Sequence, residues 1–99
     1  EIIIVEGILV MSDPDIRELG DLCVFVEAPD DIRLTRRIRR DVVERGRNVE
    51  GVLEQYLSTV RPMHNLHIVP CKKYASIHLD GTAPIQESVQ ILEEVIQNY

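Results

Sequence analysis

The chain has 99 residues, 44% of them hydrophobic, and a formal net charge of −6 at pH 7. This length suits one small domain or part of a larger one, and the acidic balance argues against a nucleic-acid binder, whose surface is normally basic. The apolar runs are far too short to cross a bilayer, so no membrane partner is expected. Cys23 and Cys71 lie far apart without the spacing of a disulfide framework, and no signal peptide stands out. A reducing cytoplasm is the simplest expectation.

The first residues are typical of a buried strand. Ile2–Val5 is a continuous β-branched run, as in strands covered on both faces of a parallel sheet. Because this pattern starts at once and no Met precedes it, we expect upstream sequence to be missing. Glu6 follows where open α/β sheets bind ligands, beyond the carboxyl end of a strand. It is either an acid near a metal or phosphate, or a solvated strand-end carboxylate.

A short helix and a second strand come next. Ser12 or Asp13 is placed to cap a helix over Pro14–Leu19, and Gly20 is expected to end it in the left-handed conformation. Leu22–Val26 has the composition of a second buried strand. Strand, helix and strand within about 25 residues predict a βαβ unit.

The longest predicted helix carries most of the arginines: seven of the nine fall within Ile32–Arg47. It should begin after a cap at Asp30 or Asp31 and break at Gly46. At about 100° per residue, its apolar positions share an arc of about 80°, and an arc of about 100° on the opposite side is lined by arginine. The apolar positions are Leu34, Ile38 and Val42, and the arginines are Arg33, Arg36, Arg37 and Arg40.

This arginine face has two interpretations. It is either an exposed helix neutralised by ion pairs, for which Asp41 and Glu44 lie close enough, or an anion site. Three features favour the anion site. The cluster contains no lysine, and arginine suits bidentate phosphate recognition. It continues across Gly46 to Arg47, and it follows the predicted βαβ unit. Phosphoryl transfer depends on charge neutralisation of this kind.

The rest of the chain predicts two helices and one strand. Asn48 can cap the next helix, Pro62 marks a kink or restart, and Pro70 should end the helical stretch after that restart. Tyr74–Leu79 resembles a short strand, and a closing helix should run from Pro84 to about Asn98. The apolar faces are Val49, Val52, Leu53, Tyr56, Leu57 and Val60 in the first helix, and Ile85, Val89, Leu92 and Ile96 in the second.

Other candidate sites are weaker. The Lys72-Lys73-Tyr74 patch is equally consistent with a solvated pair and with a nucleotide contact. His64, His67 and Cys71 have the spacing of metal ligands on one helix face, but a proline interrupts the helix and no fourth ligand is evident, so zinc is not expected. The sequence holds no GxxxxGK[ST] phosphate loop, no GxGxxG and no clear nucleophile triad.

Three segments in order, IIIVEGIL, VFVEAPDDIRLTRRIRRDVVERGRNVEGVLEQYLSTVRPMH and PCKKYASIHL, resemble the C-terminal half of the uridine kinase (uridine–cytidine kinase) family. The most specific part is RLxRRIxRDxxERGR followed by EQYLxTVxPMH. The resemblance implies an α/β fold, the C-terminal part of a P-loop nucleoside kinase, with parallel strands, flanking helices and a helical lid over about 33–60. It also implies that 1–99 is a single partial domain that lacks an N-terminal half.

The family uses Mg²⁺ and transfers the ATP γ-phosphate to the 5′-hydroxyl of uridine or cytidine, in cytoplasmic pyrimidine salvage and often as a tetramer. The resemblance implies that Glu6 lies near Mg²⁺. It implies that Arg37, Arg47 and Gln55 bind the nucleoside. It also implies that Arg40 and Arg45 approach the triphosphate as catalytic groups. The Lys72–Tyr74 segment also matches the family.

The departures matter. The family's phosphate loop, its general-base aspartate and much of its uridine pocket precede the EGIL segment, so we expect no kinase activity from the 99 residues alone. Ser76 stands where the family usually has Asp, and the tail after Asp80 is less typical. Two alternatives remain: a related kinase such as phosphoribulokinase or pantothenate kinase, or a non-catalytic remnant that binds a nucleotide or a protein.

Overall fold

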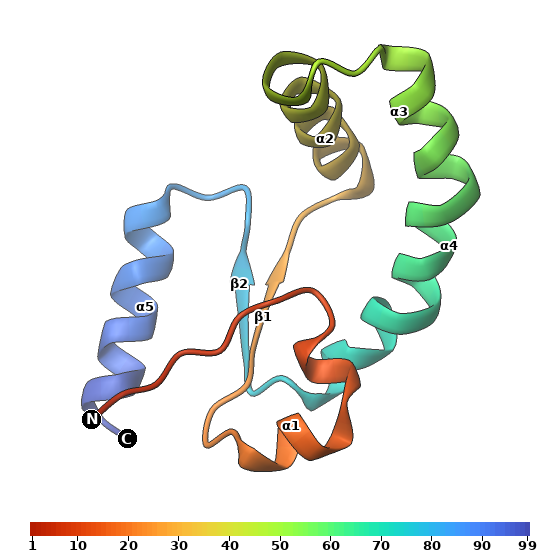
Figure 1. Cartoon of the computed structure of the whole chain (residues 1–99). Helices are drawn as coiled ribbons and strands as arrows, with labels where there is room; N and C mark the ends of the chain where they lie inside the picture. Colours follow the sequence, from red (N-terminus) through yellow and green to blue (C-terminus); the bar gives the residue numbers. More distant parts are fainter.

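Two short parallel strands lie between the other elements in the computed structural model, which describes all 99 residues (Figure 1). β1 (Val24–Glu27) pairs with β2 (Ile77–Asp80). Both strands overlap their predicted ranges, Leu22–Val26 and Tyr74–Leu79, but begin two or three residues later and end one residue later. The register sets Val24 opposite Ile77 and Glu27 opposite Asp80. The α/β class and the parallel strands with flanking helices are therefore confirmed.

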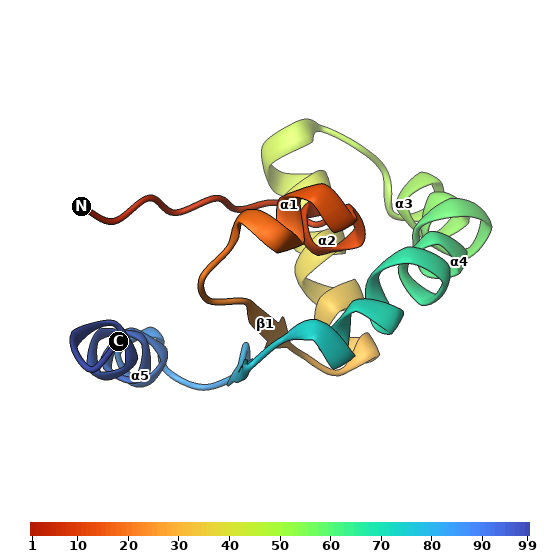
Figure 2. The same ribbon diagram turned by 90° about the horizontal axis from the view of Figure 1, so that it is seen from below.

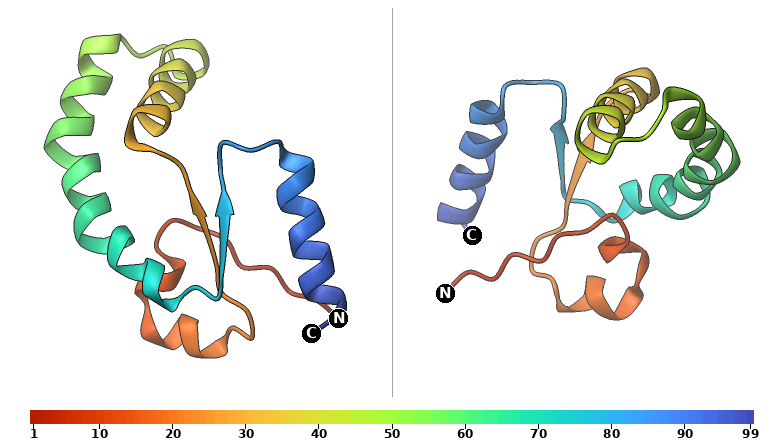
Figure 3. Two further views of the ribbon diagram at one scale, coloured as in Figure 1. Left: turned by 180° about the vertical axis from the view of Figure 1, so that it is seen from behind. Right: turned by 45° about the horizontal axis from the view of Figure 1, so that its top comes forward.

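A long helical arm connects the two strands (Figure 1 and Figure 3). It begins with α2 (Asp30–Arg45) and turns back into α3 (Val49–Gln55). A π turn over Tyr56–Val60, α4 (Arg61–Met63), a second π turn over His64–Ile68 and a 3-10 helix over Val69–Tyr74 complete it. This arm is the crossover that a parallel strand pair requires.

Neither predicted proline break interrupts the arm. Pro62 lies in the first turn of α4, and Pro70 lies in the first turn of the 3-10 helix, which continues to Tyr74. The wider π turns on both sides of α4 let the backbone remain helical around Pro62.

The predicted strand Ile2–Val5 is wrong. This segment has no strand partner and extends away from α1 and the helical arm (Figure 2), and its residues are 65–80% exposed. A strand forms only where another strand supplies hydrogen bonds, and the sheet contains β1 and β2 alone. The predicted βαβ unit over the first 26 residues is therefore absent.

The first helical segment is close to its prediction. After a 3-10 turn over Val10–Ser12, α1 (Pro14–Leu19) starts with Pro14, and the Asp13 carboxylate accepts a hydrogen bond from the Asp15 amide at 2.9 Å. Gly20 differs, since its φ of −82° is not left-handed. The chain leaves α1 in an extended conformation after the Gly20 amide donates to the Arg17 carbonyl.

The helix ends around the arginine cluster are mostly as expected. Gly46 adopts the left-handed conformation with φ 64°, and the Asn48 side chain accepts from the Gly51 amide at 2.7 Å. The predicted caps Asp30 and Asp31 are wrong, because Pro29 occupies the cap position and both acids lie in the first turn. Their charges still favour the positive end of the helix.

The closing helix α5 (Ile85–Gln97) exists, but most of its predicted buried face is exposed. Ile85 is 77% exposed, Val89 45% and Ile96 36%, and Leu92 is half-buried. In Figure 1, α5 stands on the side of β2 away from the arm, with no element packed over it. The buried side chains are instead few: Val52, Tyr56, Cys71, Leu79 and the charged Asp41. No helix combines the length and the apolar character that crossing a membrane requires.

Candidate site: an arginine cluster around Asp41

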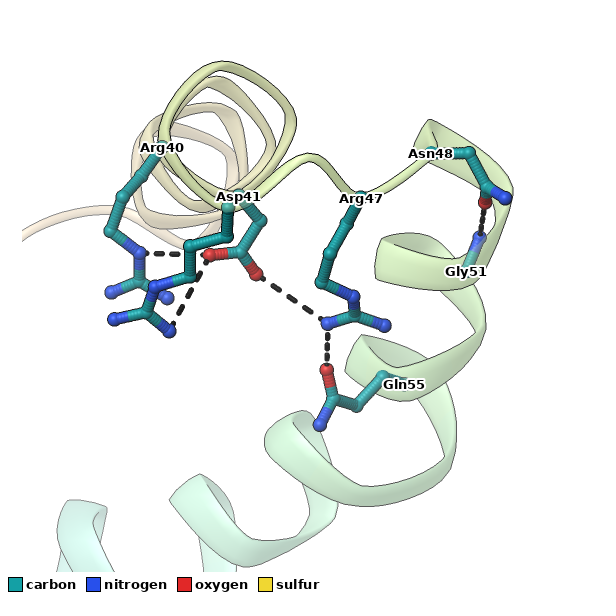
Figure 4. A network of polar contacts seen from close by, with 7 residues as sticks. Arg40, Asp41, Arg47, Asn48, Gly51 and Gln55 are labelled. Atoms are coloured by element: carbon teal, nitrogen blue, oxygen red, sulfur yellow. Dashed lines mark hydrogen bonds and ion pairs between the residues drawn. The ribbon is translucent and has the colours of Figure 1, made fainter.

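A single buried carboxylate gathers three guanidinium groups between α2 and α3 (Figure 4). Asp41 is only 1% exposed. Its Oδ1 lies 2.9 Å from Arg40 Nε and 3.8 Å from Arg45 Nη1, and its Oδ2 lies 3.6 Å from Arg47 Nη1. We call Arg40, Asp41, Arg45 and Arg47 the Asp41 cluster.

The backbone of the same residue forms the turn that presents two of these arginines. The Asp41 carbonyl accepts hydrogen bonds from the amides of Gly46 and Arg47, the latter at 3.0 Å. Gly46 supplies the left-handed conformation that lets the chain turn, at little steric cost. Arg45 therefore leaves the last turn of α2, while Arg47 points back from the loop toward the same carboxylate.

The cluster extends to α3 through Arg47. Its Nη1 donates a short hydrogen bond to the side-chain oxygen of Gln55, in addition to its contact with Asp41. Next to Arg47, the Asn48 side chain caps the start of α3 by accepting from the Gly51 amide (Figure 4). Arg47 and Gln55, both expected at the nucleoside, are thus brought together.

The charges of the cluster do not cancel. Three guanidinium groups face one carboxylate, and the side chains of Arg40, Arg45 and Arg47 remain 41%, 60% and 36% exposed. The hydrogen bond from Arg40 lowers the pKa of Asp41 against the opposing effect of burial, and the nearby charges of Arg40, Arg45 and Arg37 add to the lowering. Asp41 therefore stays ionised at neutral pH, and the positive charge that remains can bind an anion.

Two of the four other arginines on α2, Arg33 and Arg37, differ in their contacts. Arg33 is engaged locally, since it donates to the Ala28 carbonyl at 3.1 Å and pairs with Asp30. Arg37 makes no hydrogen bond or ion pair, but its charge acts on Asp41. The expected nucleoside residue Arg37 thus lies near the Asp41 cluster without belonging to it.

Glu6 lies outside the cluster. It is exposed, and it lines a shallow surface hollow of the N-terminal segment together with Ser12 and Asp13. No hydrogen bond or ion pair joins it to another residue. The structure therefore does not bring Glu6 and the arginines together, and its place near Mg²⁺ stays a prediction.

The carboxyl edge of the sheet carries two acids that were not predicted as site residues. Glu27 and Asp80 end β1 and β2 opposite each other, and they line an open hollow with His78. Glu27 pairs with Lys72, and hydrogen bonds from the Thr82 hydroxyl and amide lower the pKa of Asp80. The signal was available, because an acid ends each apolar run in VFVE and IHLD.

The weaker candidates make local contacts. Lys73 and Arg17 both lie over the ring of Tyr74, at 5.1 and 3.8 Å from its centroid. The thiol of buried Cys71 donates to the backbone carbonyl of His67 at 3.2 Å. Burial, with a smaller contribution from Arg33, lowers the pKa of His64. These contacts all lie within the chain, and a nucleotide contact at Lys72–Tyr74 stays a prediction.

Comparison with known proteins shows which proteins this chain resembles. The profile of the "Phosphoribulokinase / Uridine kinase family" matches residues 1–85. The uridine kinase of Halobacterium salinarum is 48% identical over 98 residues, which is 98% of this chain and 43% of that protein. The uridine kinase of Clostridium perfringens is 53% identical over 103 residues, which is 100% of this chain and 50% of that protein. The chain thus spans half or less of the length of these relatives.

Proposed function

The chain belongs to the phosphoribulokinase/uridine kinase family, and we propose that it supplies the lid arginines of a uridine or cytidine kinase. The family has the P-loop NTPase fold, to whose α/β part the parallel strands belong. One observation carries the proposal: three guanidinium groups surround one carboxylate, and one of them, that of Arg47, bonds to a glutamine on the next helix. The names of the relatives favour a nucleoside over the sugar phosphate of a phosphoribulokinase.

The proposed reaction moves one phosphoryl group. The 5′-hydroxyl oxygen of uridine or cytidine attacks the γ-phosphorus of ATP, the bond to the β–γ bridging oxygen breaks, and ADP leaves. The hydroxyl proton goes to a base that lies outside these 99 residues. Arg40 and Arg45 bind the triphosphate and neutralise the charge that develops as this bond breaks. Arg37, Arg47 and Gln55 orient the nucleoside, whose hydroxyls and base offer partners for guanidinium and amide groups.

A helical lid over about 33–60 is part of the proposal. It contains α2, α3 and the Asp41 cluster. Closing such a lid excludes water, which strengthens the interaction between arginine and phosphate.

Mg²⁺ is the cofactor that the family implies. Proteins usually hold this ion through one or two carboxylates together with substrate phosphates and water. The exposed carboxylate of Glu6, which has no protein partner, fits that donor set. A bound ion would add positive charge next to the phosphates.

Completing the chain tests this function. We would join residues 1–99 to the part of the Clostridium perfringens uridine kinase that the match does not cover, and measure ADP release with ATP and Mg²⁺. We expect turnover that needs uridine or cytidine, and none from residues 1–99 alone. A folded chimera that is inactive with both nucleosides, or active only with ribulose 5-phosphate, would contradict the proposal.

We further propose that the completed enzyme acts in cytoplasmic pyrimidine salvage and forms a homo-oligomer, with a tetramer as the expected state. Analytical ultracentrifugation of the chimera measures that state. A monomer at micromolar concentration would contradict it.

A further inference from the structure

Asp41 has no role in the reaction proposed above, yet it has more polar contacts than any other residue near the arginines. Its side chain meets three guanidinium groups, and its carbonyl accepts two backbone amides. The side chain is also buried, which is unusual for a carboxylate in a chain with only five buried residues. Such a group requires an explanation.

We propose that Asp41 is a positioning residue that holds the triphosphate arginines Arg40 and Arg45 and the nucleoside arginine Arg47 in one arrangement before either substrate binds. The inference rests on the proposed phosphate role of Arg40 and Arg45. Asp41 touches neither substrate and acts only through these side chains.

Two opposite effects decide what Asp41 does to anion binding. Its negative charge repels a phosphate, and this alone would weaken binding. Its contacts also restrict long arginine side chains that otherwise lose rotamer freedom when they bind a ligand. Because Arg45 and Arg47 are 60% and 36% exposed, water screens the repulsion, whereas the restriction by a buried carboxylate persists. The positioning effect should therefore be larger.

Asp41 also connects the two groups of arginines. One oxygen meets Arg40 and Arg45, while the other meets Arg47, which in turn bonds to Gln55. One carboxylate therefore contacts the arginines of both groups.

The test uses the 99-residue chain and inorganic tripolyphosphate, with affinity measured by calorimetric titration. We compare Asp41→Asn with Glu44→Gln, which removes the same charge from an exposed residue of α2 that makes no ion pair. Positioning predicts about fivefold weaker binding for Asp41→Asn, although charge alone predicts tighter binding. Glu44→Gln should bind equally well or up to about twofold more tightly.

The outcomes separate this inference from the proposed function. If the unmodified chain binds tripolyphosphate and Asp41→Asn binds it equally well or more tightly, the positioning role alone is overturned. No binding by the unmodified chain overturns both the phosphate site and the positioning role. Circular dichroism verifies the helix content of each variant.

A measurement on the unmodified chain covers the case in which Asp41→Asn fails to fold. With carbon-13 and nitrogen-15 labelling, the carboxyl signal of Asp41 should shift with tripolyphosphate at the same midpoint as the Nε–H signals of Arg40 and Arg47. Arginine signals that move while the Asp41 carboxyl signal stays fixed would overturn the inference.

Discussion

The α2–α3 region and the outer region, which consists of the N-terminal segment and α5, differ in whether their side chains have contacts within the chain. Between α2 and α3, the most strongly charged groups are paired: Asp41 is buried among three arginines, and Val52 and Tyr56 are buried close by. In the outer region, the apolar groups have no cover, with Ile3 79% and Ile85 77% exposed. One region is held together by its own contacts, and the other is not.

The difference follows from sequence distance. The contacts of the Asp41 cluster join residues between Arg40 and Gln55, so local turns and caps are enough to form them. An apolar strand or helix face becomes buried only against elements far away in the chain. The two regions should therefore respond differently to the same kind of substitution.

The largest effect on stability should come from Val52 on α3. This side chain is fully buried, so Val52→Ala should lower the free energy of unfolding by about 2 kcal/mol. Val43→Ala on α2 is the matched control, since Val43 is 76% exposed and its replacement should change that free energy by less than about 0.5 kcal/mol. Urea unfolding followed by circular dichroism measures both. Equal effects would show that α3 is not packed as described.

A smaller loss is expected at the turn between the helices. Gly46 has a φ of 64°, and an added Cβ would meet nothing within 4 Å, so Gly46→Ala is strained by backbone conformation alone. We expect a loss of about 1 kcal/mol in the free energy of unfolding. Gly46→Asn should cost less, because asparagine tolerates the left-handed conformation. A fully neutral Gly46→Ala would contradict this geometry.

Acid should weaken the α2–α3 region through Asp41. Mainly because Arg40 donates a hydrogen bond, the folded pKa of this carboxyl lies below its ordinary 3.8. The unfolded chain then binds more protons in the window between the folded pKa and 3.8, so stability rises with pH there. The contribution is complete above that window and is lost as pH falls through the folded pKa.

Asp41→Asn should therefore make the free energy of unfolding depend less on pH in that acid window than it does in the unmodified chain. Urea unfolding at a series of pH values measures the difference. Asp80, whose pKa is also lowered, contributes equally to both proteins. The same pH dependence in Asp41→Asn and the unmodified chain would count against the cluster.

The smallest effect is expected in the outer region. Ile3→Ala removes a side chain that packs against nothing, so the free energy of unfolding should change by less than about 0.5 kcal/mol. This contrasts with Val52→Ala, which removes less hydrocarbon. A loss above about 1 kcal/mol would mean that the N-terminal segment is packed, and the contrast between the regions would disappear.

The sequence predicted most features that depend on neighbouring residues and missed those that depend on distant partners. Asn48 as a cap, Asp13 as one of two proposed caps, Gly46 as the end of the arginine-rich helix and that helix itself rest on local chemistry and are confirmed. Two local predictions are wrong: Gly20 is not left-handed, and Pro29 takes the cap position expected of Asp30 or Asp31. The strand at Ile2–Val5 and the buried face of α5 required partners that a pattern of apolar residues cannot reveal.

The candidate site shows the same division. The sequence placed Asp41 near the arginines, but it could not show that one carboxylate would be buried among three of them. The side-chain bond between Arg47 and Gln55 depends on how α3 folds back along α2, which periodicity does not determine.

The most direct test of the central claim compares Arg40→Ala with Arg47→Ala in the completed chimera, by steady-state kinetics with uridine and ATP. If the cluster serves two substrates, Arg40→Ala should lower kcat about 100-fold and change the uridine KM little. Arg47→Ala should chiefly raise the uridine KM. A loss in Arg40→Ala confined to the uridine KM would contradict the assignment of Arg40 to the transferred phosphoryl group.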